Sequence, residues 1–356
     1  MLKIAIMLES FSVGGAQRVV SELVKNLDKT QIDLRVICCE ERVDTAMARE
    51  IEKVAEVVYL NTNGQNILKR FKIVFKYLKE FQPDVVNTHL TPQLYAVPWG
   101  ILHKKPIIIT AHTKPEKAFV KKIEFLIRWA LRHSKLYIVA VSQENLRLVK
   151  NYFGIDESRC CYINNGIDID AFYREEHENF TFINVARQDE NKNQDAIIRC
   201  FAQLHKERPD TRLVLLGDGP CHNKLCELRD EFGLKNVIEL PGSKSNVADY
   251  YARADIYVQA SHREAMPMSV LEAMAAGLPI ISTDVGGMRD VVQGNGYLYE
   301  DNDEDRLFCI MQKMVCAKPQ EKRSMCQASR KVSELFSAKS MAAKYLNLFI
   351  ERGKYR

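Results

Sequence analysis

Short runs of aliphatic and β-branched residues alternate with amphipathic stretches along this chain of 356 residues. Runs of roughly four to eight such residues between polar, Gly or Pro positions are typical of buried strands, and apolar positions three or four apart are typical of helices. Their regular alternation predicts parallel sheets with helices on both faces. In the first half the pattern predicts strands at 3–8, 34–38, 54–60, 84–89, 107–111 and 136–142, with helices that include 17–27, 66–80 and 92–103.

The pattern is interrupted once and then restarts. The dipeptide Asn165-Gly166 is a turn signal after a short strand, and the acidic run 175–178 is typical of an exposed linker. Strands are expected again from Phe180 onward, and the length suits two α/β domains of ordinary size. We expect a first domain at 1–168, a second domain at 169–336 and a terminal helix within 337–356.

The stretch 255–287 predicts a strand, a loop, a helix and a second strand in succession. Pro267 and Ser269 mark the start of the helix, Pro as a first-turn residue and Ser as a cap candidate. Gly277 is a good stop signal for the same helix. A unit of this kind belongs to a parallel sheet and binds ligands at the carboxyl ends of its strands.

Two carboxylates, Glu264 and Glu272, flank the start of this helix. Glu264 falls on the loop and Glu272 in the first turns of the helix, so both are expected to face the same crevice. The backbone N–H groups of 266–270 are expected to be free at this helix end and to suit an anion such as a diphosphate. The alternative is a pair of solvated glutamates beside an ordinary loop.

Cations and glycines follow two other strands of the second half. Arg187 follows the strand 180–185 and Lys192 begins the next helix, so the two can clamp a diphosphate, although either alone would also suit an exposed surface. Gly217 and Gly219 allow a tight turn after the next strand. The third glycine of a dinucleotide fingerprint is absent, which argues against an NAD-dependent oxidoreductase.

In the first half, polar residues follow three of the predicted strands, and two glycines follow the first strand. His89, His112 and Ser142 each come after a predicted strand, and the carboxyl end of a parallel strand is the expected rim of a site. The alternative for each is a residue that merely ends a strand. Gly14 and Gly15 follow the first strand and allow a ligand to approach the backbone closely.

Taken in order, the segments GGAQR, AHT, NGID, Arg-(x4)-Lys, GDGP and Glu-(x7)-Glu resemble the motifs of the retaining glycosyltransferases of family 4. The resemblance covers nearly the whole chain. It implies a GT-B fold, in which two Rossmann-like domains with parallel sheets face a central cleft and the C-terminal helix crosses back to the first domain. The family usually has Gly after the first Glu, where this chain has Ala265.

The resemblance also implies roles for individual residues. His112 would donate a hydrogen bond to the donor sugar, Glu264 would contact that sugar, and Glu272 would bind the ribose hydroxyls. The catalytic residues that the resemblance implies are His112, Glu264, Arg187 and Lys192. The donor-binding residues that it implies are Gly14, Gly15, Arg187, Lys192, Gly217, Gly219, Glu264, Met266, Pro267, Met268, Ser269 and Glu272. No metal and no cofactor are expected, because the two cations can offset the charge on a leaving diphosphate.

Composition narrows the class of protein further. An apolar fraction of 46% is enough to fill cores and argues against disorder, and no apolar run reaches the roughly 20 residues of a membrane span. Glu9 and the glycine pair that follows interrupt the apolar start too early for an export signal, so a cytoplasmic protein is expected. The ten cysteines lack CxxC spacing and are expected to be free thiols.

Positive charge is concentrated in one segment. The chain carries a net charge of +5, and 104–135 holds nine Lys or Arg and two Glu. This segment suits a helix on an anionic membrane surface, flanked by Phe125 and Trp129, and the alternative is a solvated helix on the core. Nucleic acid is not an expected partner, because no motif for it accompanies the charge. The cations expected on one helical stripe are Lys114, Lys117, Lys121, Arg128, Arg132 and Lys135.

The sequence therefore predicts a retaining, metal-independent hexosyltransferase that uses a nucleotide-diphospho-sugar, with a UDP-sugar favoured. The expected acceptor is a glycan or a lipid-diphosphate-linked glycan in surface polysaccharide biosynthesis, such as capsule or lipopolysaccharide. The expected location is the cytoplasm, with peripheral contact at the inner face of the cell membrane. Two alternatives stay open: a nucleotide-sugar epimerase of similar architecture, and a non-catalytic nucleotide-sugar-binding protein, which an intact set of site residues disfavours.

Overall fold

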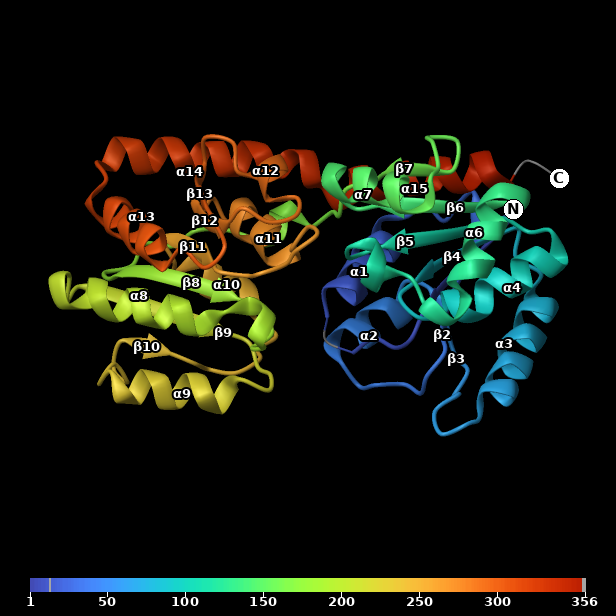
Figure 1. Cartoon of the computed structure of the whole chain (residues 1–356), viewed down its shortest axis with the longest axis horizontal. Coiled ribbons are helices and arrows are strands. Elements are labelled where there is room, and N and C mark those ends of the chain that lie inside the picture. The colour runs from blue at the N-terminus through green and yellow to red at the C-terminus, as the bar shows by residue number, and fades with distance from the viewer. Residues whose placement is uncertain (13, 354–356) are drawn as a thin grey trace. The chain divides into compact units, whose positions relative to one another are not determined.

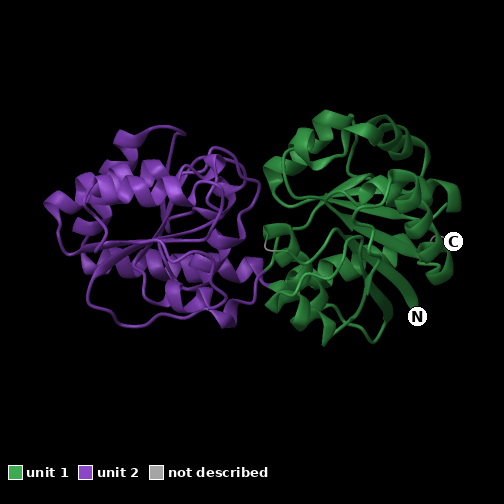
Figure 2. Cartoon of the chain, turned by 90° about the horizontal axis from the view of Figure 1, so that it is seen from below, with its two compact units in different colours: residues 1–166, 338–356 green, residues 167–337 purple. Residues whose placement is uncertain are grey.

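The computed structural model describes residues 1–12 and 14–353 and divides the chain into two compact units (Figure 2). Unit 1 comprises Met1–Gly166 and Ala338–Arg356, and unit 2 comprises Ile167–Ser337. Each unit has its own parallel sheet and its own buried apolar core. The predicted architecture of two Rossmann-like domains is therefore confirmed.

Within the described part of unit 1, seven strands form one parallel sheet in the order β3-β2-β1-β4-β5-β6-β7 (Figure 1). The chain first moves outward from β1 to β3 and then returns to place β4 on the other side of β1. Ligands bind at such a switch point, at the carboxyl ends of β1 and β4. The strands are β1 (Leu2–Leu8), β2 (Ile32–Cys38), β3 (Glu56–Tyr59), β4 (Val85–His89), β5 (Ile107–Ala111), β6 (Leu136–Ala140) and β7 (Cys160–Tyr162). The helices of this part are α1 (Gly15–Asn26), α2 (Ala46–Glu52), α3 (Ile67–Phe81), α4 (Gln93–His103), α5 (Pro115–Ala118), α6 (Glu124–His133) and α7 (Gln143–Phe153).

Unit 2, all of whose residues are described, repeats this plan with six parallel strands in the order β10-β9-β8-β11-β12-β13. Its switch point lies between the carboxyl ends of β8 and β11. The strands are β8 (Phe180–Val185), β9 (Thr211–Leu216), β10 (Ile238–Glu239), β11 (Ile256–Gln259), β12 (Ile280–Thr283) and β13 (Gly296–Tyr299). The helices are α8 (Gln194–Glu207), α9 (His222–Glu231), α10 (Val247–Ala252), α11 (Met268–Ala275), α12 (Met288–Val291), α13 (Glu304–Cys316) and α14 (Pro319–Ser333).

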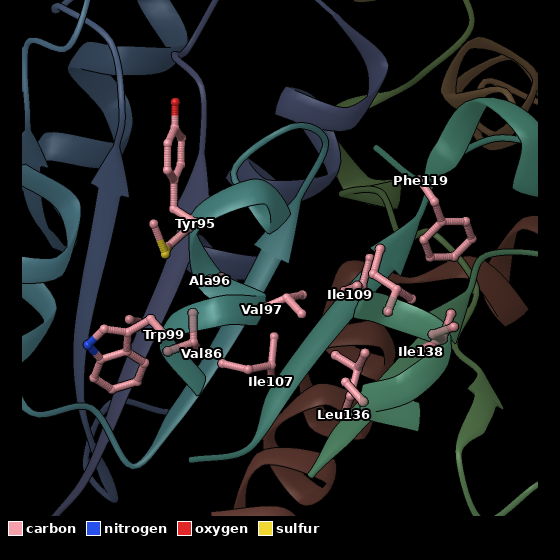
Figure 3. Close-up of a cluster of buried hydrophobic side chains, with 14 of the residues drawn as sticks. Val86, Tyr95, Ala96, Val97, Trp99, Ile107, Ile109, Phe119, Leu136 and Ile138 are labelled. Carbon is pink, nitrogen blue, oxygen red and sulfur yellow. The ribbon is translucent and has the colours of Figure 1, made fainter. Parts of the chain in front are cut away.

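The core of unit 1 holds α4 tightly against the sheet. Val86 of β4, Trp99 of α4 and Ile107 of β5 belong to one cluster of buried side chains (Figure 3). A Cβ atom on Gly100 would lie 2.2 Å from Cγ1 of Ile107, so a larger residue there would push the helix away. This packing holds α4 against β4 and β5 near the amino ends of the two strands.

The helix α15 (Ala338–Gly353) belongs to unit 1, although unit 2 precedes it in the sequence. It packs against α1, β1 and β4. The hydroxyl of Tyr345 lies 3.1 Å from Oγ1 of Thr110 in β5, and Nζ of Lys344 donates to Oδ1 of Asn164 at 2.9 Å. The predicted return of the C-terminal helix to the first domain is therefore confirmed.

The basic segment 104–135 contains the strand predicted at 107–111, but not the single helix that the spacing of its cations predicted from Lys114 onward. It contains β5, the one-turn helix α5, a 3-10 helix at Lys121–Ile123 and α6. The backbone is extended at Phe119 and Val120, between α5 and the 3-10 helix, so the cations from Lys114 to Lys135 do not follow one continuous helix. Among residues 1–12 and 14–353, no helix combines the length and the apolar character needed to cross a membrane.

Candidate functional site

The carboxyl ends of β8 and β11 bring together a cation and a carboxylate. Lys192 ends a 3-10 helix, Glu190–Lys192, that follows β8, and Glu264 lies on the loop after β11. Nζ of Lys192 lies 2.5 Å from Oε1 of Glu264, and the two side chains are only 20% and 10% exposed. The pair is therefore an ion pair with little water around it, at the switch point of the sheet.

Asn191 joins the two loops that carry this ion pair. Its carbonyl accepts a hydrogen bond from the N–H of His262 at 2.8 Å, and its Nδ2 donates to the carbonyl of Arg263 at 3.0 Å. Nε of Arg263 donates in return to Oδ1 of Asn191 at 3.3 Å. The positions of Lys192 and Glu264 are thus fixed by neighbours on both loops. Sequence reasoning did not find Asn191, since a single asparagine before Lys192 carries no distinctive signal.

A glycine of the loop after β12 supports the backbone of Glu264. Gly286 has a φ of 61°, in the left-handed region. A Cβ atom there would lie 2.2 Å from the carbonyl oxygen of Glu264, and the N–H of Gly287 donates to the carbonyl of Ala265 at 2.7 Å. Ala265 itself does not have a positive φ, so its side chain causes no backbone strain where the family usually has Gly.

The helix α11 begins differently from the prediction. Pro267 is the residue before the helix, not a first-turn residue, and Met268 is the first helical residue. Ser269 is not the cap, because its Oγ lies 2.8 Å from the hydroxyl of Tyr257. The N–H of Val270 is not free either, since it donates to the carbonyl of Pro267 at 3.3 Å. The free donors expected at this helix start are therefore fewer than predicted.

Glu272 is a buried residue of α11, inside unit 2. Its side chain is nearly inaccessible, with the residue 3% exposed. The hydroxyl of Tyr251 lies 3.2 Å from Oε2 of Glu272 and 2.9 Å from the carbonyl of Ser269, so the two acceptors share its one proton. Burial raises the pKa of the Tyr257 phenol, its hydrogen bond with Ser269 opposes this, and the carboxylates of Glu264 and Glu272 raise it further. Sequence reasoning assigned neither tyrosine to the site.

The remaining predicted residues of unit 2 lie along the same edge of the sheet. Arg187 follows β8 with its side chain 72% exposed, and its Nε lies 3.8 Å from Oδ2 of Asp189. Gly217, after β9, has a φ of 138°, and a Cβ atom there would lie 1.9 Å from the carbonyl oxygen of Ala186. A Cβ atom on Gly219 would lie 2.3 Å from the carbonyl oxygen of Gln188. Both glycines allow the loops after β8 and β9 to pack closely.

In unit 1, the carboxyl ends of β4 and β5 bring two histidines into contact. Nδ1 of His89 lies 2.8 Å from Nε2 of His112. Burial lowers the pKa of His112 to about 4, and burial together with His112 lowers the pKa of His89 well below its usual value. Both rings are therefore neutral at neutral pH. Gly14 and Gly15 lie at the start of α1, on the other side of the same switch point.

The predicted site residues thus form two sets, one in each unit. Unit 1 holds Gly14, Gly15 and His112, and unit 2 holds all the others. In the described residues, no group of three or more His, Cys, Asp or Glu side chains is arranged to hold a metal ion. Unit 2 gathers two cations, a helix start and close-packed glycine loops at one edge of its sheet, features that suit an anion.

Two family models match the chain. The model described as Glycosyltransferase Family 4 matches residues 13–171, and the model described as Glycosyl transferases group 1 matches residues 167–332. The first match falls largely in unit 1 and the second in unit 2. The two matches join near the point where the chain passes from one unit to the other.

Individual proteins are similar to this chain as well. An uncharacterized glycosyltransferase of Methanocaldococcus jannaschii is 28% identical over 267 residues, which are 66% of this chain and 65% of that protein's length. The N-acetylgalactosamine-N,N'-diacetylbacillosaminyl-diphospho-undecaprenol 4-alpha-N-acetylgalactosaminyltransferase of Campylobacter jejuni is 26% identical over 333 residues, 86% of this chain and 88% of that one. The crystal structure of Anabaena HepE in complex with UDP-glucose has a TM-score of 0.85 at 18% identity, over 99% of this chain and 100% of that one. The chain therefore belongs to the family 4, or group 1, glycosyltransferases and has their GT-B fold.

Proposed function

We propose that the chain transfers a sugar from a UDP-sugar to a glycan or a lipid-diphosphate-linked glycan, with retention of the anomeric configuration, in surface polysaccharide biosynthesis. Two likenesses support the choice of donor and acceptor. HepE, which shares the fold, was crystallised with UDP-glucose, and the name of the Campylobacter relative describes transfer onto a sugar linked to undecaprenol diphosphate. The site of unit 2 would bind the donor.

The ion pair between Lys192 and Glu264 carries the proposal. Because Lys192 is mostly shielded from water, its charge acts on a neighbouring anion with little screening. A diphosphate at the ends of β8 and β11 would contact the ammonium group of Lys192 beside Glu264. The carboxylate of Glu264 would then accept hydrogen bonds from hydroxyl groups of the donor sugar with its other lone pairs. One side chain pair would thereby hold the leaving group and the sugar next to each other.

Arg187 supplies the second cation of the proposed site. Its guanidinium is largely in solvent, and its contact with Asp189 is a loose ion pair. Such a pair contributes little energy, so the guanidinium can turn toward a phosphate and bind two of its oxygens. Together with Lys192 it would offset the charge that develops on the leaving diphosphate. With two cations in that role, the reaction would need no metal ion.

The other residues of the set would bind and orient the donor. Glu272, held by Tyr251, would accept hydrogen bonds from the ribose hydroxyls. Backbone N–H groups at the start of α11 and the close-packed loops at Gly217 and Gly219 would surround the diphosphate. No side chain is proposed as a nucleophile, because in the retaining reaction of this family the acceptor attacks on the side of the leaving group.

A thermal-shift experiment with UDP, GDP, ADP and their sugars, in the presence of EDTA, tests the donor site. UDP is expected to raise the melting temperature without added metal, because a ligand at about 100 times its Kd stabilises the folded state by about 2.7 kcal/mol. Arg187→Ala and Lys192→Ala are expected to abolish the shift. A shift that requires a divalent cation would contradict the metal-independent reaction, and no shift with any nucleotide would contradict the proposed donor.

We also propose that unit 1 contacts an anionic membrane, where a lipid-linked acceptor would be found. On α6, the side chains of Phe125 and Trp129 are 84% and 42% exposed, and Lys121 and Lys122 are exposed just before this helix. Exposed aromatic side chains beside lysines suit the boundary between headgroups and acyl chains. Arg128 does not take part, because it pairs with Glu124 and donates to the carbonyl of Tyr152 at 2.8 Å.

The triple variant Lys117→Glu, Lys121→Glu and Lys122→Glu is expected to lower binding to anionic vesicles by about 100-fold. Each lysine near such a surface contributes about 1 kcal/mol. Co-sedimentation with vesicles that contain phosphatidylglycerol would measure the loss. A matched control reverses the same number of charges at exposed lysines of unit 2, namely Lys206, Lys235 and Lys331. Equal binding by the two triple variants would refute this membrane contact.

A further inference from the structure

A chain of buried hydrogen bonds at the ends of β4 and β5 determines which atoms carry the protons. Nδ2 of Asn87 donates to the carbonyl of Ile108 at 3.1 Å. A carbonyl oxygen can only accept, so the side-chain atom of Asn87 that faces it must be the amide nitrogen. The other atom, Oδ1, lies 2.8 Å from Nε2 of His89. Because Oδ1 can only accept, Nε2 of His89 carries a proton and donates it.

The same reasoning extends to the second histidine. Both rings are neutral at neutral pH, so a His89 that is protonated at Nε2 has a lone pair at Nδ1. That lone pair faces Nε2 of His112 at 2.8 Å, so His112 must be the donor in this contact. We propose that His89, oriented by Asn87, is a positioning residue that holds His112 in the tautomer protonated at Nε2, so that His112 offers its Nδ1 lone pair to the substrate.

The identity of the ligand group that faces Nδ1 of His112 rests on the proposed function. The inference changes the role expected of His112. The family resemblance suggested that His112 donates a hydrogen bond to the donor sugar. In the tautomer set by His89, the nitrogen that remains for a ligand accepts instead. His112 would therefore recognise a hydroxyl group, which can donate, and would disfavour a carboxylate or a carbonyl oxygen at the same place, which cannot.

Two further features adjoin this chain of hydrogen bonds. Leu90, directly after His89, has a φ of 61°, a costly conformation for a leucine that persists only where its surroundings require it. Nδ2 of Asn87 also donates to Oγ1 of Thr110 at 3.1 Å, and this oxygen lies 3.1 Å from the hydroxyl of Tyr345 on α15. The histidine pair thus ends a buried chain of polar groups that spans three elements of unit 1.

The tautomer of His112 can be measured directly by long-range 1H–15N NMR of protein labelled with 15N-histidine. The chain has eight histidines, and His112→Gln assigns the signal. At pH 7.5 we expect a protonated Nε2 and an unprotonated Nδ1 for His112, and the same pattern for His89. A signal from His112 protonated at Nδ1, or averaged between the two forms, would overturn the inference. This measurement needs no substrate, so the inference can fail while the proposed function holds.

Kinetics then test whether His89 acts through His112. His89→Leu removes the acceptor and is expected to lower kcat/KM for the donor about 5- to 10-fold, the loss of roughly one oriented hydrogen bond. In a His112→Ala background the same substitution is expected to change kcat/KM less than twofold, because its target is gone. Equal losses in both backgrounds would show a purely structural role and overturn the inference.

His89→Asn serves as the conservative variant. Its Oδ1 can take the place of Nδ1 and accept from His112, so kcat/KM is expected to stay within about threefold of the wild type and His112 is expected to keep its tautomer. Melting temperatures check that both His89 variants are folded. If neither variant folds, the NMR pattern of the wild type decides, since it depends only on the His112 assignment. A UDP-sugar with a carboxylate at the position that faces His112 is also expected to have a lower kcat/KM than the UDP-sugar with a hydroxyl group there.

Discussion

Replacing Lys192 with alanine is expected to lower kcat/KM for sugar transfer by about 10²–10³-fold. Removal of one preorganised charge or donor from a catalytic site typically has an effect of this size. Lys192 is well placed for such an effect because its ammonium group lies 2.5 Å from Glu264 at the end of the sheet, in a position that is only 20% exposed. Steady-state kinetics with the UDP-sugar that stabilises the protein most would measure the loss.

The variant also leaves Glu264 without its cation, and the two effects must be separated. The double variant Lys192→Ala/Glu264→Ala is expected to recover the melting temperature that Lys192→Ala loses, since no unpaired buried charge remains, and to recover none of the activity. Lys224→Ala changes a lysine of α9 whose side chain is 69% exposed, and it is expected to keep activity within about twofold. Wild-type turnover by Lys192→Ala would contradict the proposed role of the cation.

Gly286→Ala is expected to destabilise unit 2 by about 2–4 kcal/mol and to remove most of the activity. The left-handed φ of 61° costs an alanine about 1 kcal/mol, and forcing the backbone of Glu264 away from the new Cβ adds about 1–3 kcal/mol. Because the displaced oxygen belongs to Glu264, the carboxylate would move with it. Melting temperature and the Kd for UDP-sugar would report the two consequences separately.

Gly294→Ala is the matched control for this substitution. Gly294 also has a left-handed φ, 77°, but a Cβ atom there would meet nothing within 4 Å. It is therefore expected to lose only the roughly 1 kcal/mol of backbone strain and to keep its affinity for the donor. If the two variants lost the same stability and the same affinity, the contact between Gly286 and Glu264 would not position the carboxylate.

Hydrophobic periodicity was enough to predict the two parallel sheets, because strand and helix periods differ and each unit repeats them. The return of the last helix was implied by the family resemblance and not by the periodicity. Periodicity failed between Lys114 and Lys135, where cations at helical spacing predicted one helix but the backbone is extended at Phe119 and Val120. Period alone cannot distinguish a continuous helix from several short pieces.

For the candidate site, residue type and spacing predicted which loops would meet, but not the contacts within them. Lys192 and Glu264 are 72 residues apart, and nothing in either loop shows that Asn191 joins them. In the sequence Ser269 looks like a helix cap. In the structure its hydroxyl lies 2.8 Å from the hydroxyl of the buried Tyr257, 12 residues earlier in the chain. The catalytic and donor-binding roles themselves stay predictions until the variants are measured.

The histidines illustrate the same limit at the level of single protons. The sequence placed His89 and His112 at neighbouring strand ends, where each could equally end a strand. Only the side-chain geometry shows that Asn87 and Ile108 decide which ring nitrogen of His89 is protonated. Spacing along the chain carries no information about tautomers, since a tautomer depends on which acceptor lies opposite each nitrogen.

The contribution of α15 to unit 1 determines the order in which the protein can be completed during translation. Unit 2 is one continuous segment, Ile167–Ser337, so it can close its core as soon as that segment has left the ribosome. Unit 1 is complete only after α15 has been synthesised, and until then parts of α1, β1 and β4 stay uncovered. Tyr345 of this helix contacts Thr110, which lies 235 residues earlier in the chain. Contacts over such separations form slowly. The unit that is synthesised first is the one that is finished last.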